Sequence, residues 1–61
     1  MTKIKKFRID ANIKQIELAK ILGISQPTLA LFEKNGLRRI ETAQKYAKIL
    51  KANALSLLEI Y

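Results

Sequence analysis

The sequence contains neither cysteine nor histidine in its 61 residues. The first absence excludes disulfides, and the two together exclude the usual zinc sites. A chain this short buries only about 60% of its unfolded surface and normally depends on a disulfide, a metal or a partner chain. Tight helix packing, dimerisation, or both are therefore expected to stabilise it. The lack of cysteine also fits a cytoplasmic location, which we expect.

Acidic residues are scarce as well, with five Asp and Glu against twelve Lys and Arg, which gives a net charge of +7. This balance favours a polyanionic partner, with nucleic acid first and an anionic membrane surface second. The basic residues are spread over several segments and not along one amphipathic face, which argues against a lipid surface. Charge that serves only solubility stays open as an alternative.

Catalytic equipment is missing too. The few carboxylates are scattered, and the sequence has no glycine-rich phosphate loop. We therefore expect no catalytic residue, no metal and no cofactor. No apolar run approaches the ~18–20 residues that span a bilayer.

Helical periodicity dominates the first part of the chain, and no strand-like alternation is present. We predict a first helix from about Thr2 to Ala11, with Asn12 and Gln15 as a capping box for the next one. A second helix ends at Gly23, which tolerates the left-handed conformation of a helix C-terminus. Its predicted inward stripe is Ile16, Leu18, Ala19 and Leu22.

The third helix begins at Ser25 or Gln26. Ser25 is a good N-cap, but Gln26 precedes Pro27 and so resists the helical region. Asn35-Gly36 is a strong stop signal. A fourth helix is predicted over 40–50, followed by a fifth over 54–60 that is capped by Asn53. The predicted apolar face of the fourth helix is Ile40, Ala43, Tyr46, Ala47 and Leu50.

Residues 15–34 therefore form two short helices joined by a tight turn, an arrangement that can place the second helix in the DNA major groove. Residues in and around this unit have the identities and spacing that are typical of one known family. They are Arg8, Gln15, Leu18, Ala19, Leu22, Gly23, Ile24, Ser25, Gln26, Leu29, Phe32, Glu33, Gly36, Ala47 and Leu50. In this pattern the chain resembles the Cro/CI/Xre helix-turn-helix family of phage and bacterial repressors. The resemblance implies one all-α domain over 1–61, a compact lambda-repressor-like bundle of about five short helices.

The resemblance also implies an ion pair between Arg8 and Glu33 that braces the recognition helix and plays no part in binding. An exposed pair of little energetic value is the alternative.

Carried over residue by residue, the implied base contacts are Gln26, Pro27, Thr28 and Leu31. An amide such as Gln26 suits adenine N6 and N7, whereas Pro27 and Leu31 suit thymine methyls. Polar residues are more usual in the family at Ala30 and Leu31, so this face departs from the pattern. Leu31 as a simple extension of the core, or as part of a surface for a protein partner, remains an alternative.

The implied phosphate contacts surround this helix. They are Lys14, Gln15, Lys34, Asn35, Arg38 and Arg39. Gln15 lies at a helix N-terminus, where free N–H groups and the helix dipole favour a phosphate. Lys20, Lys45 and Lys48 are interpreted as solvated surface charges.

Family members bind pseudopalindromic operators as dimers, so a weak homodimer is implied, at least on DNA. The C-terminal segment is rich in apolar residues. We expect Leu57 and Ile60 to dock on the core and Leu55, Leu58 and Tyr61 to face a partner, although all of them completing a small core is an alternative.

The resulting prediction is a DNA-binding repressor of Cro/Xre type in a bacterial or phage-infected cell, with double-stranded operator DNA as its partner. The alternative is a protein-interaction module, antitoxin-like or antirepressor-like, that uses the apolar face of the third helix or the C-terminal leucines.

Overall fold

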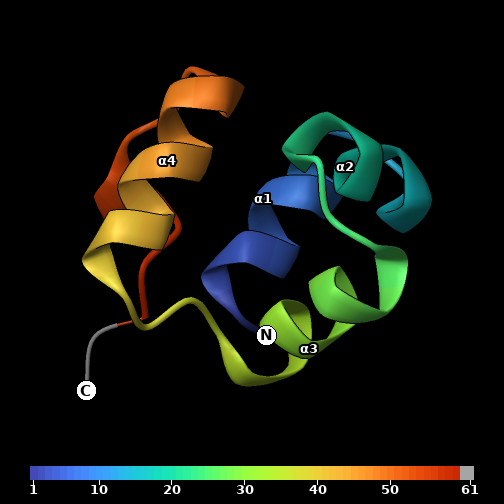
Figure 1. Cartoon of the computed structure of the whole chain (residues 1–61), viewed down its shortest axis with the longest axis horizontal. Helices are drawn as coiled ribbons and strands as arrows, with labels where there is room; N and C mark the ends of the chain where they lie inside the picture. The colour runs from blue at the N-terminus through green and yellow to red at the C-terminus, as the bar shows by residue number, and fades with distance from the viewer. Residues whose placement is uncertain (60–61) are drawn as a thin grey trace.

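The computed structural model describes residues 1–59, which form four α-helices and one short 3₁₀ helix. They are α1 (Lys3–Asp10), α2 (Gln15–Leu22), α3 (Gln26–Asn35), α4 (Ile40–Leu50) and η1 (Ala54–Ser56). In Figure 1, α1 lies between α4 on one side and α2 on the other. The predicted all-α class is confirmed.

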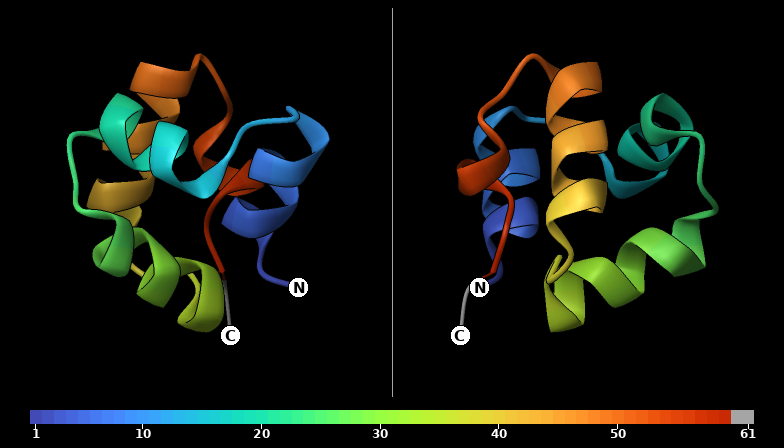
Figure 2. Two further views of the ribbon diagram at one scale, coloured as in Figure 1. Left: turned by 90° about the vertical axis from the view of Figure 1, so that its right-hand side faces the viewer. Right: turned by 60° about the vertical axis from the view of Figure 1, so that its left-hand side comes forward.

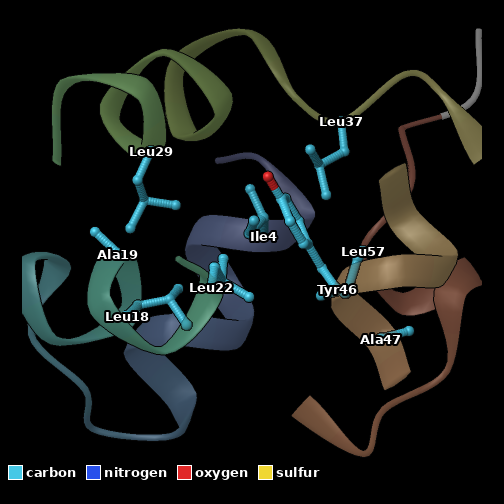
Figure 3. Packing of buried hydrophobic residues seen from close by; sticks show 9 residues of the cluster. All are labelled: Ile4, Leu18, Ala19, Leu22, Leu29, Leu37, Tyr46, Ala47 and Leu57. Atoms are coloured by element: carbon cyan, nitrogen blue, oxygen red, sulfur yellow. The ribbon is translucent and has the colours of Figure 1, made fainter. Parts of the chain in front are cut away.

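A single hydrophobic cluster holds these elements together (Figure 3). Every α-helix, the loop before α4 and the C-terminal segment contribute to it, and its members are Ile4, Leu18, Ala19, Leu22, Leu29, Leu37, Tyr46, Ala47 and Leu57. The rings of Tyr46 and Phe32 pack edge to face, with centroids 6.1 Å apart. Burial of this set is the main term that stabilises the fold.

The helix ends follow local sequence signals. Thr2 is the N-cap of α1, and its side chain accepts the Lys5 N–H. Gly23 ends α2 in the left-handed region at φ 71°. Ser25 caps α3, which resolves the ambiguity at its start, and its Oγ accepts the Thr28 N–H at 3.3 Å. The stop predicted at Asn35-Gly36 and the bounds predicted for α4 are confirmed.

Two predictions about α2 were wrong. Asn12 does not cap this helix but lies in the preceding loop at φ 58°; Lys14 is the N-cap, and its backbone N–H is bound by Glu17. Ile16 does not face inward, because 49% of it is exposed. At 3.6 residues per turn, Ile16 lies roughly 140° around the helix from the stripe of Leu18 and Leu22.

Apolar residues are also exposed at two helix ends. Ile40, predicted to lie on the apolar face of α4, is 41% exposed at the first position of that helix, and burial begins only at Ala43. Ala11, the predicted last residue of the first helix, lies just past the end of α1 and is exposed as well. In both helices the apolar residues continue to the end of the helix, but the neighbouring elements that bury them do not reach that far.

The predicted fifth helix is shorter than expected. It is a single 3₁₀ turn capped by Asn53, after which the chain straightens and Leu58 forms a parallel bridge with Leu37. The Glu59 N–H donates to the Leu37 carbonyl at 2.7 Å. Backbone hydrogen bonds to the loop before α4 thus replace the expected helical ones.

The bridge also corrects the predicted dimer surface. Leu58 is 8% exposed and belongs to the intramolecular core, so its assignment to a partner interface was wrong. Leu57 is fully buried as predicted, and Leu55 is 56% exposed. Ile60 and Tyr61 lie outside the described residues.

Candidate nucleic-acid interface

The α2–turn–α3 unit lies at one edge of the molecule. In both views of Figure 2, α3 forms the lower border and α2 lies above its N-terminal end. The contact between α2 and α3 is the most extensive between two elements. Leu29, fully buried, anchors α3 from its inner side, and small, buried Ala19 allows α2 to lie close to it. The opposite side of α3 is left open to solvent.

The residues predicted to contact bases lie together on this open side. Gln26, Pro27, Thr28 and Leu31 are all exposed. Residues four apart on a helix are neighbours, so Leu31 follows Pro27 directly along the surface. The neighbouring Ala30 is exposed too.

Glu33 is the only carboxylate between residues 25 and 39, and it points away from this side. Its Oε2 accepts the Arg8 Nε–H at 2.7 Å, and its Oε1 accepts from Arg8 Nη2 at 3.2 Å. Side-chain exposure is 16% for Arg8 and 4% for Glu33. The brace implied by the resemblance is therefore a buried, bidentate ion pair that fixes α1 to α3.

A hydrogen-bond chain links this ion pair to the exposed tip of α3. Gln15 Nε2 donates to Glu33 Oε1 at 3.2 Å, and Gln26 Nε2 donates to Gln15 Oε1 at 3.2 Å. The order is thus Arg8, Glu33, Gln15 and Gln26, from the interior to the surface. Each member fixes the orientation of the next, so the Gln26 amide is held before any ligand arrives.

Sequence reasoning missed this chain of side chains. It assigned Gln15 to a phosphate and Gln26 to a base without relating the two. The only signal in the sequence was that each residue begins one helix of the same two-helix unit, and their contact depends on the angle between α2 and α3. Gln15 still has the backbone position at the start of α2 that suits a phosphate.

Cations border the site. Lys14 and Lys34 are exposed, as are Asn35, Arg38 and Arg39 at the end of α3 and in the loop that follows. Arg38 Nε donates to the Asn35 carbonyl at 3.3 Å, so this arginine lies along the end of the helix. Since Glu33 is neutralised internally, the exposed charge of residues 25–39 is entirely positive.

The structure offers no metal centre within residues 1–59: no three acidic side chains gather closely enough to hold an ion. Nor is any helix of this region long and apolar enough to cross a membrane. Burial raises the pKa of the Tyr46 hydroxyl above its ordinary value of 10.0, but this residue lies in the core and not at the α3 surface.

Comparison with known families matches residues 4–57 to a helix-turn-helix family. The chain belongs to the Cro/C1-type helix-turn-helix family. It therefore carries a DNA-binding helix-turn-helix domain.

Two curated relatives are similar over much of this chain. Both are named Antitoxin HigA1, from the CDC 1551 / Oshkosh and ATCC 25618 / H37Rv strains of Mycobacterium tuberculosis. Each is 37% identical over 54 residues, which cover 87% of this chain. The same match covers only 36% of each relative's own length. No solved structure matches the chain.

Proposed function

We propose that this chain is a sequence-specific regulator of transcription that binds double-stranded DNA as a repressor and catalyses no reaction. Residues 1–61 would form a single domain and act in the cytoplasm. Helix α3 would enter the major groove of a pseudopalindromic operator, and two copies would place their α3 helices about one DNA turn apart. The bound protein would block access to a promoter.

The burial of Glu33 carries the proposal. An exposed carboxylate in α3 would repel phosphates, but Glu33 is paired with Arg8 and 6% exposed. The hydrogen-bonding and charged groups left on the surface then include the Gln26 amide and the cations Lys34 and Arg39, with no exposed carboxylate among residues 25–39. A polar side chain that can hydrogen-bond to a base edge, flanked by cations that can bind the phosphates on either side of the groove, is the arrangement expected of a DNA-binding surface.

The held amide of Gln26 supports base readout. One of its Nε2 hydrogens is used by Gln15, which leaves the second hydrogen and the Oε1 atom. Adenine presents N7 as an acceptor and N6–H as a donor in the major groove, and these two atoms match that pair. Preorientation by Gln15 lowers the entropy lost on binding.

Binding-site selection from a random duplex pool, followed by anisotropy titrations of selected and scrambled duplexes, tests the proposal. Gln26→Ala should relax sequence preference by ~1–3 kcal/mol. Arg38→Ala should weaken binding to all duplexes alike and reduce the salt slope by about 1. Lys45→Ala, an exposed α4 lysine, is the control and should change neither. If selection enriches no sequence, or if both site variants bind like the parent, the proposal is wrong.

A second candidate function is a protein-interaction module with a toxin protein as its partner. The name of the curated relatives and the exposed Leu31 and Leu55 favour it. Mixing the purified chain with proteins encoded beside its gene and measuring complex mass by light scattering distinguishes the two. A stoichiometric protein complex together with no selected DNA would support the module.

A further inference from the structure

The exposed side of α3 is largely apolar beyond Gln26. Pro27, Ala30 and Leu31 are exposed, and 60% of Leu31 is accessible to solvent. None of these three side chains can donate or accept a hydrogen bond. Between Gln26 and Lys34, only Thr28 brings a polar group to this surface.

The hydroxyl of Thr28 is already used within the protein. Its Oγ1 lies 2.8 Å from the Oγ of Ser25, and the Thr28 N–H binds the same Ser25 oxygen. Both contacts belong to the N-cap of α3. Because the hydroxyl is engaged by the N-cap, the methyl branch of Thr28 adds apolar surface for a ligand one helical turn from Leu31.

Among groups that DNA bases present in the major groove, only the 5-methyl of thymine is apolar. An apolar surface in that groove therefore gains energy from thymine and gains none from the polar edges of the other bases. A protein partner would also suit Leu31, but the positive border and the held Gln26 amide beside it favour DNA.

Resting on the proposed function, we infer that Leu31, with Pro27 and the Thr28 methyl, reads the 5-methyl groups of thymines. The preferred half-site then combines one adenine, bound by Gln26, with neighbouring thymines that are recognised by burial alone. Leu31 is the residue that determines specificity at those thymines.

Replacement of thymine by deoxyuridine tests this inference, because it removes the methyl group and preserves base pairing. The probe is the duplex obtained by selection, with each half-site thymine changed in turn. Parent protein should lose about fourfold in affinity per buried methyl. Leu31→Ala should bind the thymine duplex more weakly and lose most of the discrimination against deoxyuridine at the thymines that Leu31 covers. Circular dichroism checks that this variant is folded.

Ile49→Ala, which trims another exposed apolar side chain, on α4, is the matched control and should keep the full sensitivity. Selected DNA that binds equally well with deoxyuridine would overturn the inference and leave the proposed function intact. Equal sensitivity in the parent and in Leu31→Ala would overturn the role of Leu31. Failure to select any DNA would instead overturn the proposed function.

Discussion

Arg8 and Glu33 are joined by two hydrogen bonds, Nε to Oε2 at 2.7 Å and Nη2 to Oε1 at 3.2 Å, across 25 residues of sequence. The pair ties α1 to the end of α3. Arg8 also donates to the Ile13 carbonyl at 3.0 Å, so one guanidinium fixes the loop before α2 as well. This largely buried cation thus helps to fix the orientation of α2 and α3 on the body.

Glu33→Gln should destabilise the protein by about 3 kcal/mol, because it leaves the largely buried Arg8 charge uncompensated. The exposed pair of Lys6 and Asp10, 2.9 Å apart, gives a matched control. Lys6→Ala there should cost only a few tenths of a kcal/mol. Chemical denaturation of both variants measures the difference. Equal costs would mean that Arg8 and Glu33 contribute no more than a surface pair.

The two glycines should respond differently to alanine. Gly23 lies at φ 71° with open space around the position of a Cβ, so Gly23→Ala should cost ~1–2 kcal/mol from backbone strain alone. Gly36 has φ 89° and ψ 157°, a region reserved for glycine, and a Cβ there would overlap the Glu59 side chain.

Gly36→Ala should therefore lower the free energy of unfolding by about 1–3 kcal/mol more than Gly23→Ala does. Urea midpoints measured at one protein concentration provide the comparison. A Gly36→Ala variant as stable as Gly23→Ala would show that residues 57–59 do not pack against the end of α3 as described.

Two leucines near the C-terminus should respond differently to substitution, because Leu58 is buried in the core and Leu55 is exposed. Leu58→Ala should cost about 2–3 kcal/mol by opening a cavity beside Leu37. Leu55→Ala should change stability by less than about 0.5 kcal/mol, since the side chain is exposed.

If Leu55 belongs to a dimer interface, Leu55→Asp should lower the sedimentation mass of the DNA complex from two copies to one. Unchanged stoichiometry would remove Leu55 from the interface.

Alkaline pH should weaken the fold partly through Tyr46. Burial raises its pKa in the folded state, so the phenol ionises first in the unfolded chain. Its contribution is fully present below about pH 10 and is lost as pH rises through the folded pKa. Tyr46→Phe should therefore show a flatter loss of stability above about pH 10 than the parent. Parallel pH curves for the two proteins would contradict this.

Local signals made most helix ends predictable. Ser25, Gly23 and Gly36 act through their own backbone preferences, so their roles follow from residue type and spacing. The resemblance added the Arg8–Glu33 pair, which no local rule provides. The exposure of the predicted base contacts agrees with helical spacing, because buried Leu29 fixes which side of α3 faces the core.

Features that depend on tertiary geometry could not be predicted in the same way. The Gln15–Gln26 hydrogen bond requires the angle between α2 and α3, and the exposure of Ile16 depends on how much of α2 the body covers. The C-terminal segment had helical spacing throughout, but pairing with Leu37 overrides that local preference after η1. Leu58 was misassigned for this reason.

The central claim is that the N-terminal half of α3 meets the DNA. NMR titration of ¹⁵N-labelled protein with the selected duplex tests it most directly. We expect the largest amide shifts at residues 25–31 and 36–39 and at Gln15, and small ones along α4 and η1. Shifts that cluster on η1 and α4, with residues 25–31 unchanged, would contradict the account.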